Sequence, residues 1–150
     1  GYRQGWDDGN AIFCTPRGAL ETALNGKGDI RNCLGATFLT TEAFRVGREY
    51  EHAEDDYDSA RDRYESLIST INQRRSDISR AYKQMRTEKN PEGIRKLENR
   101  IAKFRRELRE AEDNLSYARS QLRFSERDLD DARYELDRFR SELRRLESQQ

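Results

Sequence analysis

The sequence has few apolar residues for its length and no long apolar run. Of its 150 residues, 33% are hydrophobic and 39% are charged, whereas an average globular domain is about half apolar and a quarter charged. No stretch of about 18 apolar residues occurs, which excludes a helix that spans a bilayer. The 29 Lys and Arg balance the 29 Asp and Glu, so a general binder of nucleic acid or anionic membranes is not expected.

The sequence also lacks the residue sets on which catalysis and metal binding depend. His52 is the only histidine, and neither it nor a third cysteine accompanies Cys14 and Cys33 at metal-ligand spacing. The glycines near the N-terminus lack the preceding strand and the following Lys-Ser/Thr of a phosphate-binding loop. We therefore expect no catalytic residues, no metal site and no cofactor.

Residues 1–40 have a composition of their own and are interpreted as a small head. They contain seven of the nine glycines, both cysteines and the only tryptophan. A disulfide between Cys14 and Cys33 would stabilise so small a unit by about 3 kcal/mol and would indicate an oxidising compartment such as the bacterial periplasm. Two free buried thiols are the alternative. A short helix is expected over residues 2–13. The expected core of the head is Trp6, Phe13, Leu20, Leu24, Leu34 and Phe38.

Residues 41–150 follow a heptad repeat on both sides of one interruption. The first stretch has at its a positions Ala43, Tyr50, Tyr57, Tyr64, Ile71, Ile78 and Met85, and at its d positions Val46, Ala53, Ala60, Leu67, Arg74 and Ala81. The second has at its a positions Ile94, Ile101, Leu108, Leu115, Leu122, Leu129, Leu136 and Leu143, and at its d positions Leu97, Phe104, Ala111, Ala118, Ser125, Ala132, Phe139 and Leu146. Such a narrow seven-residue repeat is typical of a coiled coil.

The interruption predicts a tight turn at about residues 89–92. Asn90 is a good helix N-cap, Pro91 suits the first helical position, and Glu92 suits the positive end of the helix dipole. A short turn makes the two helices antiparallel neighbours. The predicted fold is therefore all-α: a long antiparallel two-helix coiled-coil hairpin with a small disulfide-bonded N-terminal head.

The side-chain volumes along the seam support this pairing. If Met85 faces Leu97, paired residue numbers sum to 182, and large side chains then face small ones. The tyrosine layers pair Tyr64 with Ala118, Tyr57 with Ser125 and Tyr50 with Ala132. A parallel homodimer would stack like on like and would pack worse. The same register brings Leu143 and Leu146 to Leu39 and Ala36, so the end of the second helix should pack on the head.

The register also predicts which charges meet at the two edges. Along one edge it sets Glu54 against Arg133, Arg61 against Glu126 and Arg75 against Glu112. Along the other it sets Glu49 against Glu135, Asp56 against Asp128 and Asp77 against Glu107. This second edge is expected to be acidic and mildly repulsive. It is interpreted either as a solvated edge or as a surface for a basic partner or a second hairpin, and Asp56, Asp128 and Glu135 are its candidate binding residues.

Two aromatic residues of the second helix do not belong to the seam. Tyr117 and Phe124 both occupy c positions, seven residues apart, and Asn114 and Gln121 beside them are uncharged. Incidental exposure and packing in a homodimer are alternatives to a docking role. Aligned exposed aromatics in a highly charged surface nevertheless make these four residues candidates for partner binding.

The N-terminal part of the chain resembles a known family. The carrying residues are Tyr2-x-x-Gly5-x-x-x-Gly9, Phe13-Cys14-Thr15-Pro16, Asn25-Gly26, Cys33 and Phe44-x-x-Gly47-x-x-Tyr50. Over about residues 2–60 this pattern is similar to domain-of-unknown-function family 2799, whose members are short envelope proteins of Gram-negative bacteria, many of them lipoproteins. The resemblance implies the periplasm, outer-membrane anchoring through an N-terminal lipid, and paired cysteines. The family's pattern commonly has a Gly near position 24, where this chain has Ala23-Leu24, and the printed sequence shows no lipidated N-terminal cysteine.

These observations favour a non-enzymatic envelope coiled-coil protein that acts as a spacer or docking module for another envelope protein. The alternative hypothesis is a small-ligand or peptidoglycan-binding module that uses the head around Trp6. No contact with nucleic acid is expected, and contact with a membrane is expected only through a lipid anchor.

Overall fold

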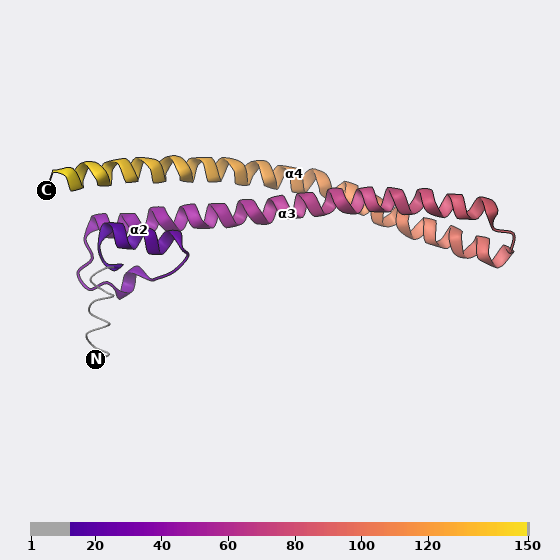
Figure 1. Ribbon diagram of the computed structural model, residues 1–150, viewed down its shortest axis with the longest axis horizontal. Coiled ribbons are helices and arrows are strands. Elements are labelled where there is room, and N and C mark those ends of the chain that lie inside the picture. The colour runs from indigo at the N-terminus through magenta and orange to yellow at the C-terminus, as the bar shows by residue number, and fades with distance from the viewer. Residues whose placement is uncertain (1–12, 150) are drawn as a thin grey trace. The chain divides into compact units, whose positions relative to one another are not determined.

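The computed structural model describes residues 13–149, which form helices joined by short connections (Figure 1). The elements are α2 (Pro16–Leu24), the 3-10 helix η1 (Ile30–Asn32), α3 (Phe38–Thr87) and α4 (Pro91–Ser148). Helices α3 and α4 pack against each other, and no strand occurs between residues 13 and 149, so the all-α antiparallel hairpin is confirmed. The chain divides into two compact units, Gly1–Tyr57 with Ser125–Gln150 and Asp58–Phe124.

The hairpin turn lies within the unit Asp58–Phe124. Helix α3 ends at Thr87 and α4 begins at Pro91. The Asn90 side chain accepts a hydrogen bond from the backbone N–H of Glu92 at 3.0 Å, and the Asn90 carbonyl accepts one from Ile94 at 3.0 Å. Asn90 is therefore the N-cap of α4 with Pro91 in the first helical position, as predicted.

Buried side chains next to the turn agree with the predicted register. Ala81 of α3 forms one cluster with Leu97 and Ile101 of α4, and Met85 and Tyr82 pack against it. Both the Ala81–Ile101 and the Met85–Leu97 layers have residue numbers that sum to 182. The seam is filled in this way because each small side chain leaves room for a large one opposite.

The ion pairs along the first edge agree with that register only in part. Arg75 and Glu112 are joined at 3.3 Å, as predicted. Arg61 lies 3.5 Å from Asp58 and 3.4 Å from Asp62 on its own helix, and its pairing with Glu126 stays a prediction. The predicted pair of Glu54 with Arg133 is not formed among the described residues, which is consistent with the small free energy of exposed pairs.

The other unit contains a third helix that the heptads did not predict. Thr15 caps α2 by accepting a hydrogen bond from Gly18 N–H at 3.1 Å, and Pro16 opens the helix. Ala19 and Leu20 of α2 share one buried cluster with α3 and α4. The members contributed by α3 and α4 are Ala43, Val46 and Leu136, with Phe44, Tyr50 and Phe139 packed against them.

The prediction that the head has a core of its own is therefore wrong in part. Leu20 is buried, but it faces the long helices and not a miniature core. Leu34 and Phe38 are 82% and 81% exposed. Phe13 packs edge-on against Phe44 of α3, with ring centroids 6.3 Å apart. Apolar residues in so short a segment are buried by packing on the hairpin, because the segment cannot enclose a core itself.

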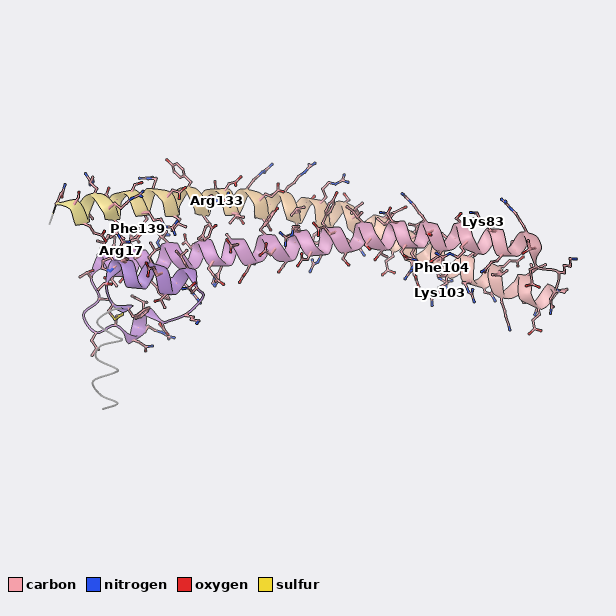
Figure 2. The ribbon with its side chains drawn as sticks, in the orientation of Figure 1. Arg17, Lys83, Lys103, Phe104, Arg133 and Phe139 are labelled. Carbon is pink, nitrogen blue, oxygen red and sulfur yellow. A yellow bond between two sulfur atoms is a disulfide. The ribbon has the colours of Figure 1, made fainter. Side chains whose placement is uncertain are left out.

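The first long helix begins earlier than residue 41. Thr37 accepts a hydrogen bond from Thr40 N–H at 3.2 Å and acts as the cap, so α3 starts at Phe38. The far end of α4 contacts α2, because Arg17 and Glu147 form an ion pair at 2.6 Å (Arg17 is labelled in Figure 2). The end of the second helix thus packs on the head, through a residue pair that the register did not specify.

Candidate functional site

Cys14 and Cys33 form a disulfide that joins the segment before α2 to the residue after η1. Their Cα atoms are 5.6 Å apart, the two residues are separated by 19 positions, and no free cysteine remains. The buried Thr40 of α3 donates a hydrogen bond to the Cys14 carbonyl at 3.4 Å. The predicted disulfide is therefore confirmed and the alternative of free thiols is wrong.

An aromatic patch lies on the outer surface of α4 in the unit Asp58–Phe124. We define it as Asn114, Tyr117, Gln121 and Phe124. Tyr117 is 62% exposed and Phe124 is 64% exposed, and Asn114 and Gln121 are also exposed. Exposed aromatic surface is unfavourable in water. Binding of a partner that buries these two rings would therefore lower the free energy.

A further exposed aromatic, Tyr134, was not singled out from the sequence. It is 65% exposed, and the Arg138 guanidinium lies 5.9 Å from its ring centroid. Tyr134 occupies an f position of the heptad repeat, on the side of the helix away from the seam, and this position could have predicted its exposure. Because it occupies f and not c, Tyr134 does not continue the row of Tyr117 and Phe124.

Asp56, Asp128 and Glu135 lie together around a groove between α3 and α4 in the other unit. We call this cavity, of about 610 Å³, the acidic groove. Its lining consists of Glu49, His52, Ala53, Asp56, Asp128, Asp131, Ala132, Tyr134, Glu135 and Arg138. Ala53 and Ala132 occupy seam positions, and their short side chains leave the hollow open.

The prediction that acidic residues repel each other along this edge is wrong at one end of the acidic groove. Arg45 lies 2.9 Å from Glu49 and 3.7 Å from Glu135, and it also binds Glu42 at 2.8 Å. Its hydrogen bonds to Glu42 and then Glu49 raise the pKa of Arg45, and the Arg45 guanidinium lowers the pKa of Glu42. Arg45 thus neutralises Glu49 and Glu135. The prediction had compared these two residues only with each other and had not included an arginine on the same helix as Glu49.

The prediction that Asp77 and Glu107 repel each other is wrong for the same reason. Arg74, the charged residue in a d position, forms an ion pair with Asp77 at 3.0 Å and another with Glu107. The hydrogen bond to Glu107 is the main cause that raises the pKa of Arg74. The acidic character of the edge is therefore concentrated at Asp56, Asp128 and Asp131, none of which has an ion-pair partner among the described residues.

Near the hairpin turn the structure shows a second groove, which the sequence reasoning missed. We call this cavity, of about 140 Å³, the basic groove. Its lining consists of Asp77, Arg80, Ala81, Gln84, Arg100 and Phe104. Figure 2 shows Phe104 and the adjacent Lys103 on α4 and Lys83 on α3 in this part of the hairpin. A count of charged residues in each segment of the sequence, in place of one count over the whole chain, could have predicted the basic groove.

From residue 13 to residue 149, no three His, Cys, Asp or Glu side chains are arranged to hold a metal ion. None of the helices in that range has the length and apolar character to cross a bilayer. Trp6, and residues 2–12 of the short helix expected over residues 2–13, lie outside the described residues. Comparison with protein-family models, with curated proteins and with solved structures finds no match to this chain.

Proposed function

We propose that this protein is a non-enzymatic coiled-coil protein of the Gram-negative envelope that acts as a spacer or docking module. The observation that carries the proposal is the exposure of Tyr117 and Phe124 on the outside of a hairpin whose seam is already filled. The internal pairing of α3 and α4 leaves only outward-facing residues for contact with another molecule. Exposed aromatic side chains supply binding free energy when a partner buries them.

The choice of compartment is supported by the disulfide and by the family resemblance. Both cysteines of the chain are used in one bond, and such bonds persist in oxidising compartments such as the periplasm. The proposed localisation is the periplasm, with tethering to the outer membrane through an N-terminal lipid. Trapping of thiols with a maleimide reagent in intact cells tests this, because reduced Cys14 and Cys33 would argue against the compartment.

The docking role is tested by photo-crosslinking in cells. A photoreactive amino acid at Gln121, in the centre of the aromatic patch, should give a discrete product. The product should decrease strongly when Tyr117 and Phe124 are both changed to Ser, because the binding surface is lost. A photoreactive residue in place of Asn99 is the matched control, since Asn99 is an exposed amide side chain of α4 that lies outside both the patch and the acidic groove. An identical product from both positions, or none from Gln121, would contradict the docking role.

A further inference from the structure

Within the unit Asp58–Phe124, positive charge is concentrated on both sides of the hairpin turn. Residues 80–106 contain ten Lys and Arg against three Glu. The rest of this unit contains seven arginines against eight Asp and Glu. We call residues 80–106 the basic end. The zero net charge of the whole chain, which argued against an anionic partner, therefore does not describe this segment.

The charges of the basic end are open to solvent and largely unpaired. All ten Lys and Arg are exposed, and among residues 13–149 only Lys103 of this set forms an ion pair, with Glu107 at 4.0 Å. Arg80 and Arg105 donate hydrogen bonds to hydroxyl groups of neighbouring side chains. The residues whose charged groups have no partner in the described part of the chain are Lys83, Arg86, Lys89, Arg95, Lys96, Arg100 and Arg106.

These cations surround the hairpin and do not define one face of it. Together the two helices place them at b, c, e, f and g, which are all the heptad positions outside the seam. Arg80 and Arg100 belong to the edge that carries the g positions, where they line the basic groove. Arg86 and Arg95, at b positions, lie toward the opposite edge, which carries the e positions. A partner that contacts one side of the hairpin would leave many of these charges without a counter-charge.

The cations lie close enough to the turn for one surface at the end of the hairpin to attract most of them. At about 1.5 Å per residue, Arg80 is about 11 Å from the end of α3 at Thr87, and Arg100 is about 14 Å from the start of α4 at Pro91. A bilayer has a polar headgroup layer of roughly 5–8 Å on each side, and electrostatic attraction at physiological salt extends about 8 Å beyond it. These two depths together reach Arg80 and Arg100 when the turn enters the headgroups.

From this arrangement we propose that the basic end binds the surface of an anionic phospholipid bilayer, with the turn directed into the headgroups. The Lys and Arg side chains on all sides of the turn then meet lipid phosphates, as basic segments do at anionic bilayers. In the basic groove, Arg80 and Arg100 reach the same headgroup from different helices, and the Asp77 carboxylate in its lining is already paired with Arg74 at 3.0 Å. This contact is separate from the docking role of the aromatic patch and from a lipid anchor.

The surface of the basic end does not fit a second protein as its partner. Protein interfaces have an apolar or aromatic centre from which charged residues are depleted. Residues 80–106 contain none of the exposed large hydrophobic side chains of the described residues, which are Leu34, Phe38, Tyr117, Phe124 and Tyr134. For the same reason we expect the basic end to stay at the headgroups and not to enter the hydrocarbon.

Single-stranded nucleic acid is also a poorer fit, because it binds through aromatic rings on which its bases stack. The two rings of the basic end are those of Tyr82 and Phe104, and both residues are half-buried. The Arg105 guanidinium lies 5.6 Å from the Tyr82 ring centroid, and the Arg74 guanidinium lies 5.7 Å from the Phe104 ring centroid. The protein's own arginines thus occupy the positions that stacked bases would take.

Binding of the purified full-length chain to vesicles tests the proposal. The chain should sediment with vesicles of phosphatidylglycerol and phosphatidylcholine, but not with vesicles of phosphatidylcholine alone. Added sodium chloride should weaken the binding, because exposed charges are screened. The variants Arg80→Gln/Arg100→Gln and Arg86→Gln/Arg95→Gln should each lower the partition onto anionic vesicles about 30-fold, since each removes two basic residues near the surface.

The matched control is Arg119→Gln/Arg123→Gln, which removes two exposed arginines of the same unit. Both lie at least about 42 Å along α4 from its start, so this variant should bind vesicles like the wild type. Circular dichroism should show that every variant keeps its helices. Equal binding to neutral and anionic vesicles, or a loss confined to the Arg80/Arg100 variant, would overturn the proposal, because contact on one edge would not direct the turn into the headgroups.

Two further measurements separate a bilayer from other sources of phosphate. Inorganic phosphate should displace the chain from vesicles no better than sodium chloride of equal ionic strength, because a layer of headgroups is met by many cations and not by one pocket. A duplex oligonucleotide should bind more weakly than anionic vesicles at the same phosphate concentration. Specific displacement by inorganic phosphate, or tighter binding to the duplex through the same arginines, would contradict a bilayer partner.

The variant Tyr117→Ser/Phe124→Ser separates the bilayer contact from the proposed function. It should bind anionic vesicles like the wild type while the crosslinked product from Gln121 decreases in cells. If the wild-type chain does not bind vesicles and the crosslink forms, the bilayer contact fails and the docking role stands. If vesicle binding depends on the four arginines and no crosslink forms, the docking role fails and the bilayer contact stands.

Discussion

Gly47 of α3 lies so close to Ala23 of α2 that a Cβ atom on Gly47 would be 2.7 Å from the Cβ of Ala23. The same atom would lie 3.0 Å from the backbone oxygen of Leu20. Backbone cannot move aside as a flexible side chain can, so the approach of α2 to α3 requires glycine at this position. Gly47 is one of the residues on which the family resemblance depends, and the contact gives it a structural reason.

The substitution Gly47→Ala should destabilise the protein. Overpacking of a close contact costs about 1–3 kcal/mol, whereas the gain in helix propensity is at most about 1 kcal/mol. Urea unfolding should therefore show a lower midpoint with an unchanged slope. Gly93→Ala is the control, because the nearest neighbours of its Cβ would be atoms of the flexible side chain of Glu88. A higher midpoint for Gly47→Ala would contradict the close packing of α2 on α3.

The hairpin could be predicted from the sequence because its signals are local and repeated. The heptads extend over many turns, and Asn90 and Pro91 carry a specific capping pattern. Helix α2 was missed because Ala19, Leu20, Ala23 and Leu24 span too few residues to establish a period. Its place was set by tertiary packing on the hairpin, which no pattern within the head describes.

The edge charges were predicted less well for a different reason. Pairing acidic residues across the seam ignored arginines three or four positions away on the same helix. Arg45 and Arg74 reach both their own helix and α4, because the long guanidinium side chain spans that gap. Leu34 and Phe38 were placed in a core because they are apolar, yet an apolar residue is not excluded from the surface.

Replacing Glu51 by Gln should stabilise the protein at neutral pH. A hydrogen bond with the Asp55 carboxyl is the main cause that raises the pKa of Glu51. A carboxyl with a raised pKa in the folded state stabilises the fold while it is protonated, and this contribution is lost as pH rises through the folded pKa. Glu51→Gln should therefore raise the melting temperature at pH 7, and the difference should disappear below about pH 4, the ordinary range of a Glu carboxyl.

Glu42→Gln provides a control of opposite sign on the same helix. The hydrogen bond from Arg45 lowers the pKa of Glu42, so its stabilisation is present at neutral pH and is lost as pH falls through the folded pKa. This variant should melt at a lower temperature than the wild type at pH 7. If both variants shift the melting temperature in the same direction at pH 7, the two carboxyl environments are not as described.

Reduction of the disulfide should loosen α2 and the start of α3. The bond closes a loop whose ends are 19 positions apart, and closure of such a loop stabilises by about 3 kcal/mol. Hydrogen exchange should become faster in Pro16–Leu24 after treatment with dithiothreitol. Residues 58–124 should exchange at the same rate, because the disulfide lies outside that unit. The variant Cys14→Ser/Cys33→Ser should exchange like the reduced protein and should not respond to dithiothreitol.

Replacing Arg74 by Gln should destabilise the unit Asp58–Phe124 more than the same change at Arg75. Arg74 binds two carboxylates, those of Asp77 and Glu107, and its guanidinium lies 5.7 Å from the ring centroid of Phe104. Among residues 13–149, Arg75 binds only Glu112, and its side chain is 63% exposed against 30% for Arg74. Loss of Arg74 leaves two acidic side chains near each other without a cation, whereas loss of Arg75 removes one solvent-screened pair. Thermal unfolding at low salt should show a clearly lower midpoint for Arg74→Gln and a nearly unchanged one for Arg75→Gln. Equal midpoints would mean that the charged d position is a tolerated interruption of the seam, and that Arg74 does not hold α3 and α4 together.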